Sequence, residues 1–600
     1  MLVHPRRGRE DRPSMRPSAP VRPIRALALA LGLVGPLMVA VPAHAATTAE
    51  ISASASAVDF GDQVTLTVTL GGEVGCLGER AVTLDWRPAD AAVFATVGSG
   101  VTSADGSVEL VQTQPHTGRY RAGIQASQGC PEAASAEVLV RVRALVEASV
   151  ALGSGEAGSC VNLVASVQPA RPGQVVDLQR RRSGDWAQIE QLTLGADSHI
   201  LSSPCFGFDD IGIVRLRVRW VAQDPLNATA TSRVLAFEIT QAPWMEAIGD
   251  AIGERSVSVA IGEEDAFLYR HDDAEPRIPA SNTKLLLSMA MLDAFGPDLQ
   301  IRTSAAVTGI DDAGVVDDVW ILGRGDPGVS KATLGSLAHE LADAGVSRVR
   351  GRVMGGTDYF RRDWSATGWN EVARDYVNRP TALTFEGNDV ADPERRAAQI
   401  LSERLEALGV PVAGKAGAGV PPGELDTVAF VRSKPLHTLL QRLLRPSDNF
   451  AAEVLGKGLG VEVAGVPGTI AKGAAAIESF TDRHGPDFTI HDSSGLSYAN
   501  RVTAVGMVQL LWVAEDATWV EDLRHALPTG GQGTLRDRLQ GVQVRAKTGS
   551  LSEVSALTGW VFSTGTGTWI EFSILSSGMS KTTASAIEDE IVRLVAEQLG

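Results

Sequence analysis

Apolar and polar residues alternate along residues 46–240 in short runs typical of β-strands. Examples are "QVTLTVTL", "RAVTLDWRP" and "AEVLVRVRA" in the first half, and "SCVNLVASVQP", "QVVDLQRRR" and "VRLRVRWVA" in the second. Turn signals such as Asp105-Gly106 separate the runs. Short alternating strands at regular spacing predict β-sandwiches. We therefore expect two all-β immunoglobulin-like modules, at residues 46–145 and 146–240, which serve as a spacer or bind cell wall or protein.

After residue 240 the pattern changes to helical stretches that alternate with strands. Helices are expected at 281–295, 334–344, 394–408, 449–459 and 583–598, and strands at "SVSVAIG", "VVDDVWILG", "ALTGWVFS" and "WIEFSIL". The stretch that starts at residue 281 is apolar nearly all round, which predicts a helix buried inside a domain. Residues 241–600 are thus expected to form an α/β or α+β domain that carries the chemistry.

The N-terminus has the order of a secretory signal peptide. Basic residues precede the apolar run "ALALALGLVGPLMVAV", and Ala43-His44-Ala45 follows it as a small-x-small cleavage pattern. Residues 1–45 are expected to direct export, to the cell envelope or the medium. The run is shorter than the ~20 residues of a spanning helix, and an uncleaved anchor is the alternative. No later segment is long and apolar enough, so the mature chain is expected to lack a membrane span.

The four cysteines, Cys76, Cys130, Cys160 and Cys205, all lie in the region of alternating strands. An exported protein can oxidise them, and proximity within the two modules favours the pairs Cys76–Cys130 and Cys160–Cys205. They lack C-x2-C spacing, so a metal site is not expected. The net charge of −17 argues against nucleic acid as a partner, because phosphate binding needs clustered basic surface.

A serine and a lysine stand three residues apart in "IPASNTKLLLSMAML", at the start of the apolar helix. Residues at this spacing share a helix face, so the Ser281 hydroxyl and the Lys284 amine can meet. A hydroxyl needs an adjacent base to become a good nucleophile, and burial can lower the pKa of a lysine enough for it to serve. Taken alone, the pair is more typical of an ordinary helix start.

A second triplet, Ser447-Asp448-Asn449, precedes the helical stretch "FAAEVLGKGL". Its structural explanation is a helix cap, because serine or aspartate at a helix start satisfies free N–H groups. Its functional interpretation has Ser447 pass a proton between Lys284 and a leaving group, while the Asn449 amide holds a substrate backbone.

A third triplet, Lys547-Thr548-Gly549, lies on or beside a predicted strand and is followed by Ser550. Glycine there lets a substrate backbone approach closely, and Lys547 and Thr548 would hold an anionic carboxylate. A turn explains this triplet equally well when it is taken alone. S-x-x-K, S-D-N and K-T-G in this order, however, are the signature of penicillin-binding proteins and serine β-lactamases.

The flanking sequence resembles the D-alanyl-D-alanine carboxypeptidase/endopeptidase family, the class C low-molecular-mass penicillin-binding proteins. The stretches that carry the resemblance lie within residues 245–600: "PASNTKLL", "LGRGDPGVS", "HDSSGLSYANRVTA", "LPTGGQGTLRDRL" and "AKTGSLSEVSALTGWV". The resemblance implies a penicillin-binding-protein/serine β-lactamase-like transpeptidase domain with a subdomain inserted at about residues 305–430. Ser281 and Ser447 are 166 residues apart, which is shorter than usual for this family.

The resemblance also implies a role for each motif residue. Ser281 would be the acylated nucleophile and Lys284 its base, and the backbone N–H groups of Ser281 and Ser550 would form the oxyanion hole. The remaining roles fall to Ser447 and Asn449 in the second motif, and to Lys547 and Thr548 as the carboxylate clamp. Asp492 and Ser494 of "HDSSGLS" would order a loop beside the site.

The implied reaction is acyl transfer on the D-Ala-D-Ala end of a peptidoglycan stem peptide, without a metal or cofactor. β-Lactam antibiotics would acylate the same serine, and the choice between carboxypeptidase and endopeptidase action stays open. One alternative is a serine β-lactamase, for which "FEGND" at residues 385–389 is the nearest acidic candidate to activate water. The other is a catalytically silent wall-binding protein.

Overall fold

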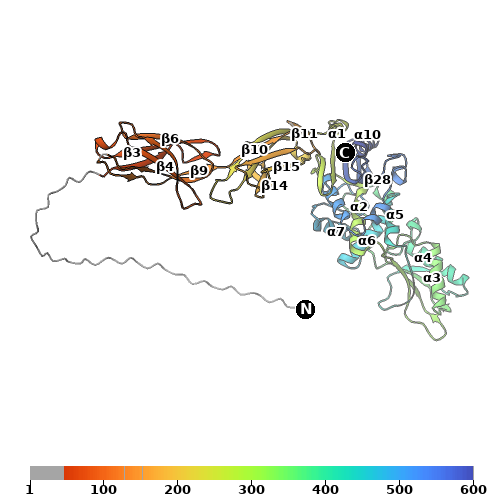
Figure 1. The fold of residues 1–600 in the computed structure, drawn as a ribbon. Coiled ribbons are helices and arrows are strands. Elements are labelled where there is room, and N and C mark those ends of the chain that lie inside the picture. The colour runs from red at the N-terminus through yellow and green to blue at the C-terminus, as the bar shows by residue number, and fades with distance from the viewer. Residues whose placement is uncertain (1–45, 128, 152, 599–600) are drawn as a thin grey trace, which may run out of the picture. The chain divides into compact units, whose positions relative to one another are not determined.

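The computed structural model describes residues 46–127, 129–151 and 153–598, so the predicted signal peptide lies outside the described residues. Residues 46–143, with the short segment Asp224–Ala228, form one compact unit, and the other described residues from Ala144 onward form a second. Within these ranges, no helix has the length and apolar character needed to cross a membrane. Figure 1 colours the chain from red at the N-terminus to blue at the C-terminus.

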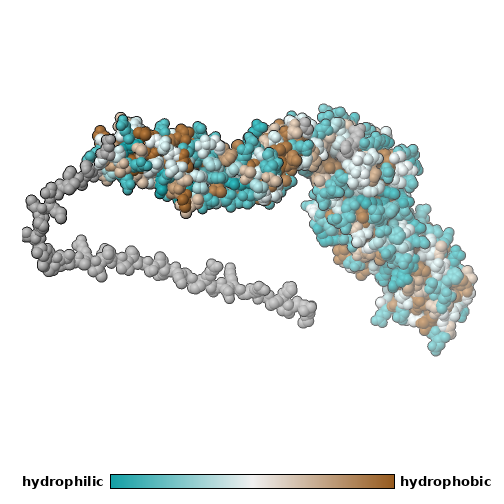
Figure 2. Space-filling view, in the orientation of Figure 1, coloured by the Kyte–Doolittle hydropathy of each residue, from teal (hydrophilic) through white to brown (hydrophobic). Residues whose placement is uncertain are grey.

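The first unit packs two β-sheets against each other. In β3 (Gln63–Gly71) every second side chain is buried, because successive side chains of a strand point to opposite faces. The buried residues of β3 meet those of the other sheet, such as Leu84 and Tyr120. The visible surface of this unit is mostly hydrophilic, with apolar residues in small spots (Figure 2). The disulfide Cys76–Cys130 has the predicted pairing.

One sheet of this unit has three strands and the other has six. The first contains β1 (Thr48–Ala53), β3 and β6 (Ser107–Thr113). The second contains, in order, β2 (Ala57–Asp59), β9 (Val138–Arg143), β7 (Gly118–Ile124), β4 (Ala81–Pro88) and β5 (Ala95–Val101), with β8 (Ala133–Ala134) beside β7.

The second unit begins with another pair of sheets. Alternate residues of β16 (Gly212–Trp220) are buried, again as its sequence predicts. One sheet contains β10 (Leu145–Val150), β12 (Leu163–Gln168) and β15 (His199–Ser202). The other contains β11 (Ser154–Glu156), β18 (Leu235–Thr240), β16, β13 (Val175–Arg182) and β14 (Asp185–Thr193), with β17 (Ala230–Thr231) beside β16. The disulfide Cys160–Cys205 also has the predicted pairing.

A five-stranded antiparallel sheet forms the centre of the following domain. Its order is β20 (Ala266–His271), β19 (Val257–Glu263), β30 (Trp569–Ser577), β29 (Val554–Phe562) and β28 (Val544–Leu551). Helices α1 (Pro243–Ile252) and α10 (Lys581–Gln598) share a core with one face of the sheet, and α8 (Ala504–Glu515) shares a core with the other. Burial on both faces explains why β29 reads as a nearly continuous apolar run. β28 lies at the edge of the sheet.

A group of helices packs on the α8 side of the sheet. Helix α2 (Thr283–Phe295) is buried from Thr283 to Leu292, as its apolar sequence predicts. It shares its core with α5 (Leu436–Leu444), α6 (Asn449–Ala464), α7 (Ile470–Arg483), α8 and α9 (Val520–Ala526). This core places the ends of α2 and α6 next to the central sheet.

The chain between α2 and α5 folds around a core of its own. Its sheet has the order β26 (Gly417–Gly419), β25 (Val353–Gly356), β23 (Val319–Leu322), β21 (Arg302–Val307) and β27 (Asp426–Arg432), and α3 (Lys331–Asp343) and α4 (Pro393–Ala407) cover it. The prediction of one continuous strand for "VVDDVWILG" is wrong, because the segment forms two strands, β22 (Val315–Val316) and β23. The split falls at two aspartates, where Asp318 Oδ1 accepts from the Arg352 N–H at 2.8 Å. β22 pairs instead with β24 (Arg348–Val349).

Candidate active site

Ser281 lies in a short 3-10 turn, η3 (Ala280–Asn282), that leads directly into α2. The α-helix therefore starts two residues later than predicted. Ala280 has a left-handed backbone (φ +46°), which is uncommon for a residue other than glycine. The Asn282 amide donates to Thr558 Oγ1 at 2.9 Å and ties the turn to β29. Ser281 is partly exposed between buried neighbours, so its hydroxyl stays within reach of a ligand.

Lys284 is fully buried and points its amine at three oxygens. Its Nζ lies 3.0 Å from Ser281 Oγ and 2.7 Å from Asn449 Oδ1, and it also contacts the Ser494 carbonyl oxygen. Burial is the main cause that lowers the pKa of Lys284 to about 8, while the carboxylates of Asp492, Glu453 and Asp448 oppose the shift. This lysine is thus neutral for part of the time near neutral pH.

The second motif stands at the start of α6, and its structural explanation as a helix cap is confirmed for Asp448. Asp448 caps the helix, with its side chain accepting from the Ala451 N–H at 3.0 Å. Ser447 has a left-handed backbone (φ +62°), and its Oγ accepts from Lys547 Nζ at 2.9 Å. Asn449 accepts from Lys284 through Oδ1, and it donates to the Tyr376 carbonyl oxygen at 3.0 Å.

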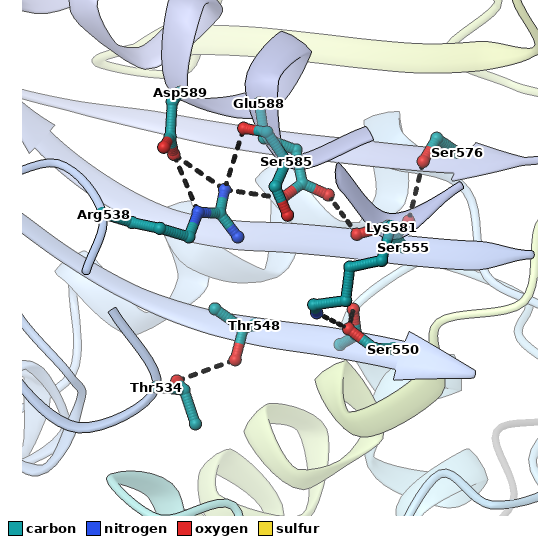
Figure 3. A network of polar contacts seen from close by, with 11 residues as sticks. Thr534, Arg538, Thr548, Ser550, Ser555, Ser576, Lys581, Ser585, Glu588 and Asp589 are labelled. Atoms are coloured by element: carbon teal, nitrogen blue, oxygen red, sulfur yellow. Dashed lines mark hydrogen bonds and ion pairs between the residues drawn. The ribbon is translucent and has the colours of Figure 1, made fainter. Parts of the chain in front are cut away.

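The third motif lies on the edge strand β28. Lys547 is fully buried, and it also donates to the Thr548 carbonyl oxygen at 2.6 Å. Burial, and then the positive charges of Lys284 and Lys581, hold the pKa of Lys547 well below its ordinary value. The Thr548 hydroxyl lies 2.7 Å from Thr534 Oγ1 (Figure 3).

Glycine at position 549 brings this strand close to the nucleophile turn. A Cβ built on Gly549 would lie 2.6 Å from the Pro279 carbonyl oxygen, which is too close for any other residue. The following residue, Ser550, donates through its hydroxyl to the Gly549 carbonyl oxygen at 2.7 Å. The structure therefore brings the predicted residues of all three motifs together, while the two cysteine pairs lie among the sheets of residues 46–240.

The loop "HDSSGLS" is ordered by Asp492, which is fully buried. Its carboxylate accepts from five donors that fix the loop and its surroundings: Trp369 Nε1 at 2.7 Å, Ser494 Oγ at 3.2 Å, Gly495 N at 3.0 Å, Ser497 N at 2.9 Å and Asn500 Nδ2 at 2.8 Å. These contacts hold the Ser494 carbonyl where Lys284 reaches it. The role of Asp492 is therefore one of positioning.

Two buried charged residues of the site were missed from the sequence. Glu453 is fully buried, and its Oε1 accepts from the N–H groups of Ser493 at 3.0 Å and Ser494 at 2.7 Å. Burial, and then the charge of Asp492, raise the pKa of Glu453 to about 7. Lys457 is also fully buried and forms an ion pair with Asp363 at 2.7 Å.

The signal that would have found them is their spacing. Asn449, Glu453 and Lys457 recur every four residues on an otherwise apolar helix, and this spacing puts them on one face of α6. On this face, Lys457 Nζ also donates to the carbonyl oxygens of Arg361 at 2.8 Å and Pro380 at 3.1 Å. The segment between those residues supplies Trp369 and Tyr376 to the site.

Replacing Gly495 by alanine is expected to lower kcat/KM by about 100-fold, the effect of a 1 Å misplacement at a reacting centre. A Cβ there would lie 1.9 Å from the Ala280 carbonyl oxygen and 2.9 Å from the Ser281 nitrogen, so the nucleophile turn must shift. Gly409→Ala is the matched control, because Gly409 has nearly the same φ, +82° against +81°, with open space around it. Equal losses in both variants would show that backbone strain alone is responsible.

Comparison with known proteins now identifies the family. A sequence profile of the D-Ala-D-Ala carboxypeptidase 3 (S13) family matches residues 247–391 and 386–598, which together make up more than half of the chain. The chain belongs to this family. Membership in the S13 family confirms the predicted class of enzyme, a serine-type D-Ala-D-Ala carboxypeptidase.

Individual relatives and a solved structure agree with this assignment. The D-alanyl-D-alanine carboxypeptidase of Actinomadura sp. (strain R39) is 31% identical over 458 residues, which cover 60% of this chain and 84% of that protein. A carboxypeptidase of Mycobacterium tuberculosis is 28% identical, over 52% of this chain and 73% of that protein. The crystal structure of penicillin binding protein 4 from Haemophilus influenzae aligns with a TM-score of 0.52 at 21% identity, over 59% of this chain and 99% of that protein. The catalytic domain thus has the fold of that protein.

Proposed function

We propose that Ser281 is the nucleophile of this enzyme and that Lys284 is its general base. The observation that carries the proposal is the contact of 3.0 Å between Lys284 Nζ and Ser281 Oγ. A neutral amine has two N–H groups and one lone pair. The oxygens of Asn449 and Ser494 accept only, so they take the two N–H groups, and the lone pair is left for the Ser281 hydroxyl proton.

Acyl transfer then follows in two halves. Ser281 Oγ attacks the carbonyl carbon of the D-Ala-D-Ala peptide bond, its proton passes to Lys284, and an ester forms when the C–N bond breaks. Ser447 accepts a hydrogen bond from Lys547, and in this proposal it gives its own hydroxyl proton to the departing amine and takes in exchange the proton that Lys284 received from Ser281. D-Alanine leaves, and water then hydrolyses the ester and restores Ser281.

The other motif residues have binding roles in this proposal. The backbone N–H groups of Ser281 and Ser550 stabilise the negative charge on the attacked oxygen. The Asn449 amide has a second N–H that is not used by Tyr376 and is available for a substrate carbonyl. Lys547 and Thr548 hold the terminal carboxylate. The substrate is accordingly a peptidoglycan stem peptide, and β-lactams acylate the same serine.

Release of D-alanine from a pentapeptide ending in D-Ala-D-Ala tests the proposal. We expect steady release by the purified chain, and a covalent adduct with fluorescent penicillin that blocks it. Rapid turnover of the drug would instead indicate a β-lactamase, and neither adduct nor release would indicate a silent binding protein. Cleavage of cross-linked dimers in the same assay measures endopeptidase activity.

Acylation by penicillin is expected to rise with pH, with an apparent pKa of about 8. Only the neutral form of Lys284 accepts the Ser281 proton, and burial lowers the pKa of this lysine to about 8. Below that pH the neutral fraction falls about tenfold per pH unit, and above it the rate levels off. The measurement is the second-order rate of labelling between pH 6 and pH 9. A rate that does not change over this range would contradict the role of Lys284 as base.

We propose further that residues 46–145 and 146–240 are immunoglobulin-like modules that act as a spacer for the domain at 241–600, and that residues 1–45 direct export. Each module has two packed sheets and one disulfide, in keeping with an oxidising compartment. The face of the first module that Figure 2 shows has apolar residues only in small spots, and this face supports the spacer role, because binding surfaces often carry large apolar patches.

A further inference from the structure

Three lysines that form no ion pair with a carboxylate of the described residues lie on or beside β28. Lys284 and Lys547 are buried there, and Lys581 is exposed at the first residue of α10. Among the residues that the structure describes, none of these three lysines forms an ion pair with a carboxylate; their amines contact only hydroxyl, amide and carbonyl oxygens. An ammonium group without a carboxylate partner at a partly buried site, such as that of Lys581, favours the binding of an anion.

We propose that Lys581 is a specificity-determining residue that binds the free carboxylate of the residue that leaves in the reaction, together with the hydroxyls of Thr548 and Ser550. Thr548 and Ser550 are two residues apart on β28, so their side chains lie on the same side of the strand. Lys581 Nζ contacts Ser550 Oγ, and in Figure 3 the lysine side chain points toward that serine. The proposal rests on the proposed function of the site.

The helix that carries Lys581 is fixed to the sheet by Glu588. This residue is seven positions further along α10, and it is buried. Its Oε1 accepts from Ser555 Oγ at 2.6 Å, and its Oε2 accepts from Arg538 Nη2 at 2.7 Å. Arg538 also binds Asp589 at 2.7 Å. Both oxygens of Glu588 are therefore hydrogen-bonded to other donors. The negative charge of Glu588 still acts on Lys581 and raises its pKa, against the larger lowering by burial, but the Lys581 amine points at Ser550 (Figure 3).

The chemistry of this edge suits a carboxylate better than an amide. A carboxylate offers two oxygens that only accept hydrogen bonds, and an ammonium group has three N–H donors. Hydrogen bonds with an ionised donor or acceptor are about twice as strong as neutral ones, and a carboxylate adds a negative charge opposite the ammonium group that a carboxamide lacks. Lys581 is thus expected to favour substrates whose leaving residue has a free carboxylate over the same substrates with that carboxylate amidated.

Binding to the full chain carrying Ser281→Ala tests the proposal without turnover. Two peptides are titrated by calorimetry, one ending in D-Ala-D-Ala with a free carboxylate and the other in its carboxamide. Lys581→Gln is expected to weaken binding of the carboxylate peptide about 10-fold or more, the usual effect of losing a hydrogen bond to a charged group. Binding of the carboxamide peptide is expected to stay unchanged, and Lys581→Arg is expected to restore most of the preference.

Lys331→Gln is the matched control, because Lys331 is also an exposed lysine at the first residue of a helix, α3. This control is expected to bind both peptides as the parent does. Equal weakening of both peptides by Lys581→Gln would reveal a merely structural role, and no weakening would show that Lys581 does not meet the ligand; either result overturns the proposal. D-Alanine release by the unmodified chain tests the proposed function separately, so the two failures are distinguishable.

Discussion

The Ser281→Ala chain is expected to release D-alanine at least about 10⁴-fold more slowly than the unmodified chain. Without the hydroxyl no acyl-enzyme forms, and the donors around the site can only assist direct attack by water. The surrounding contacts, such as Lys284 with Asn449, do not depend on that hydroxyl, so the fold is expected to survive. The measurement is the initial rate of D-alanine release at saturating peptide.

Ser288→Ala is the matched control for this prediction. Ser288 is a buried serine of the same helix, and its hydroxyl donates to the Lys284 carbonyl oxygen at 2.7 Å, away from the amine. We expect this variant to lose some stability, on the order of 1 kcal/mol for one hydrogen bond, and to keep its activity. If Ser281→Ala retained activity within about tenfold of the parent, another residue would have to be the nucleophile.

Lys284→Met is expected to slow acylation by fluorescent penicillin by about 10³-fold, within the range of 10²–10⁴ that general base catalysis supplies. Methionine has a similar length and an apolar end, so it fills the buried space without a charge. The Ser281 hydroxyl then lacks a partner that takes its proton. The remaining slow labelling is expected to lose the pH dependence predicted above, because the titrating amine is gone.

Lys472→Met serves as the control for the lysine. Lys472 likewise donates to three oxygens, the carbonyls of Ala464 at 3.1 Å, Gly465 at 2.7 Å and Pro467 at 3.0 Å. These oxygens lie at or just after the C-terminal end of α6, whereas Asn449 is its first residue. Labelling at the parent rate is expected. If Lys284→Met were labelled as fast as this control at every pH, a group other than Lys284 would have to accept the proton of the Ser281 hydroxyl.

The sequence was sufficient to predict which residues share the site, because the residues within each short motif are held together by their spacing along the chain. The spacing of Ser281 and Lys284 predicts their contact, and the structure has it at 3.0 Å. Contacts between motifs follow from the tertiary fold instead. The contact of Lys547 with Ser447 joins residues 100 positions apart, and the sequence analysis did not predict it.

The residues that were missed act through distant partners. Glu453 and Trp369 reach the site by binding the loop at Asp492–Ser494, and a single sequence shows nothing of that loop's position. Helix α8 was missed for another reason. Its sequence "AVGMVQLLWVAE" is apolar on most sides because the sheet and other helices surround it, and this burial removes the alternation that marks a surface helix.

The mass of the intact protein after treatment with excess penicillin, followed by mapping of the modified peptide, tests the central claim most directly. We predict a gain of one drug molecule per chain, located on the peptide that contains Ser281 and absent from the Ser281→Ala chain. An unchanged mass, or a drug molecule attached to any other residue, would contradict the assignment of Ser281 as the acylated nucleophile.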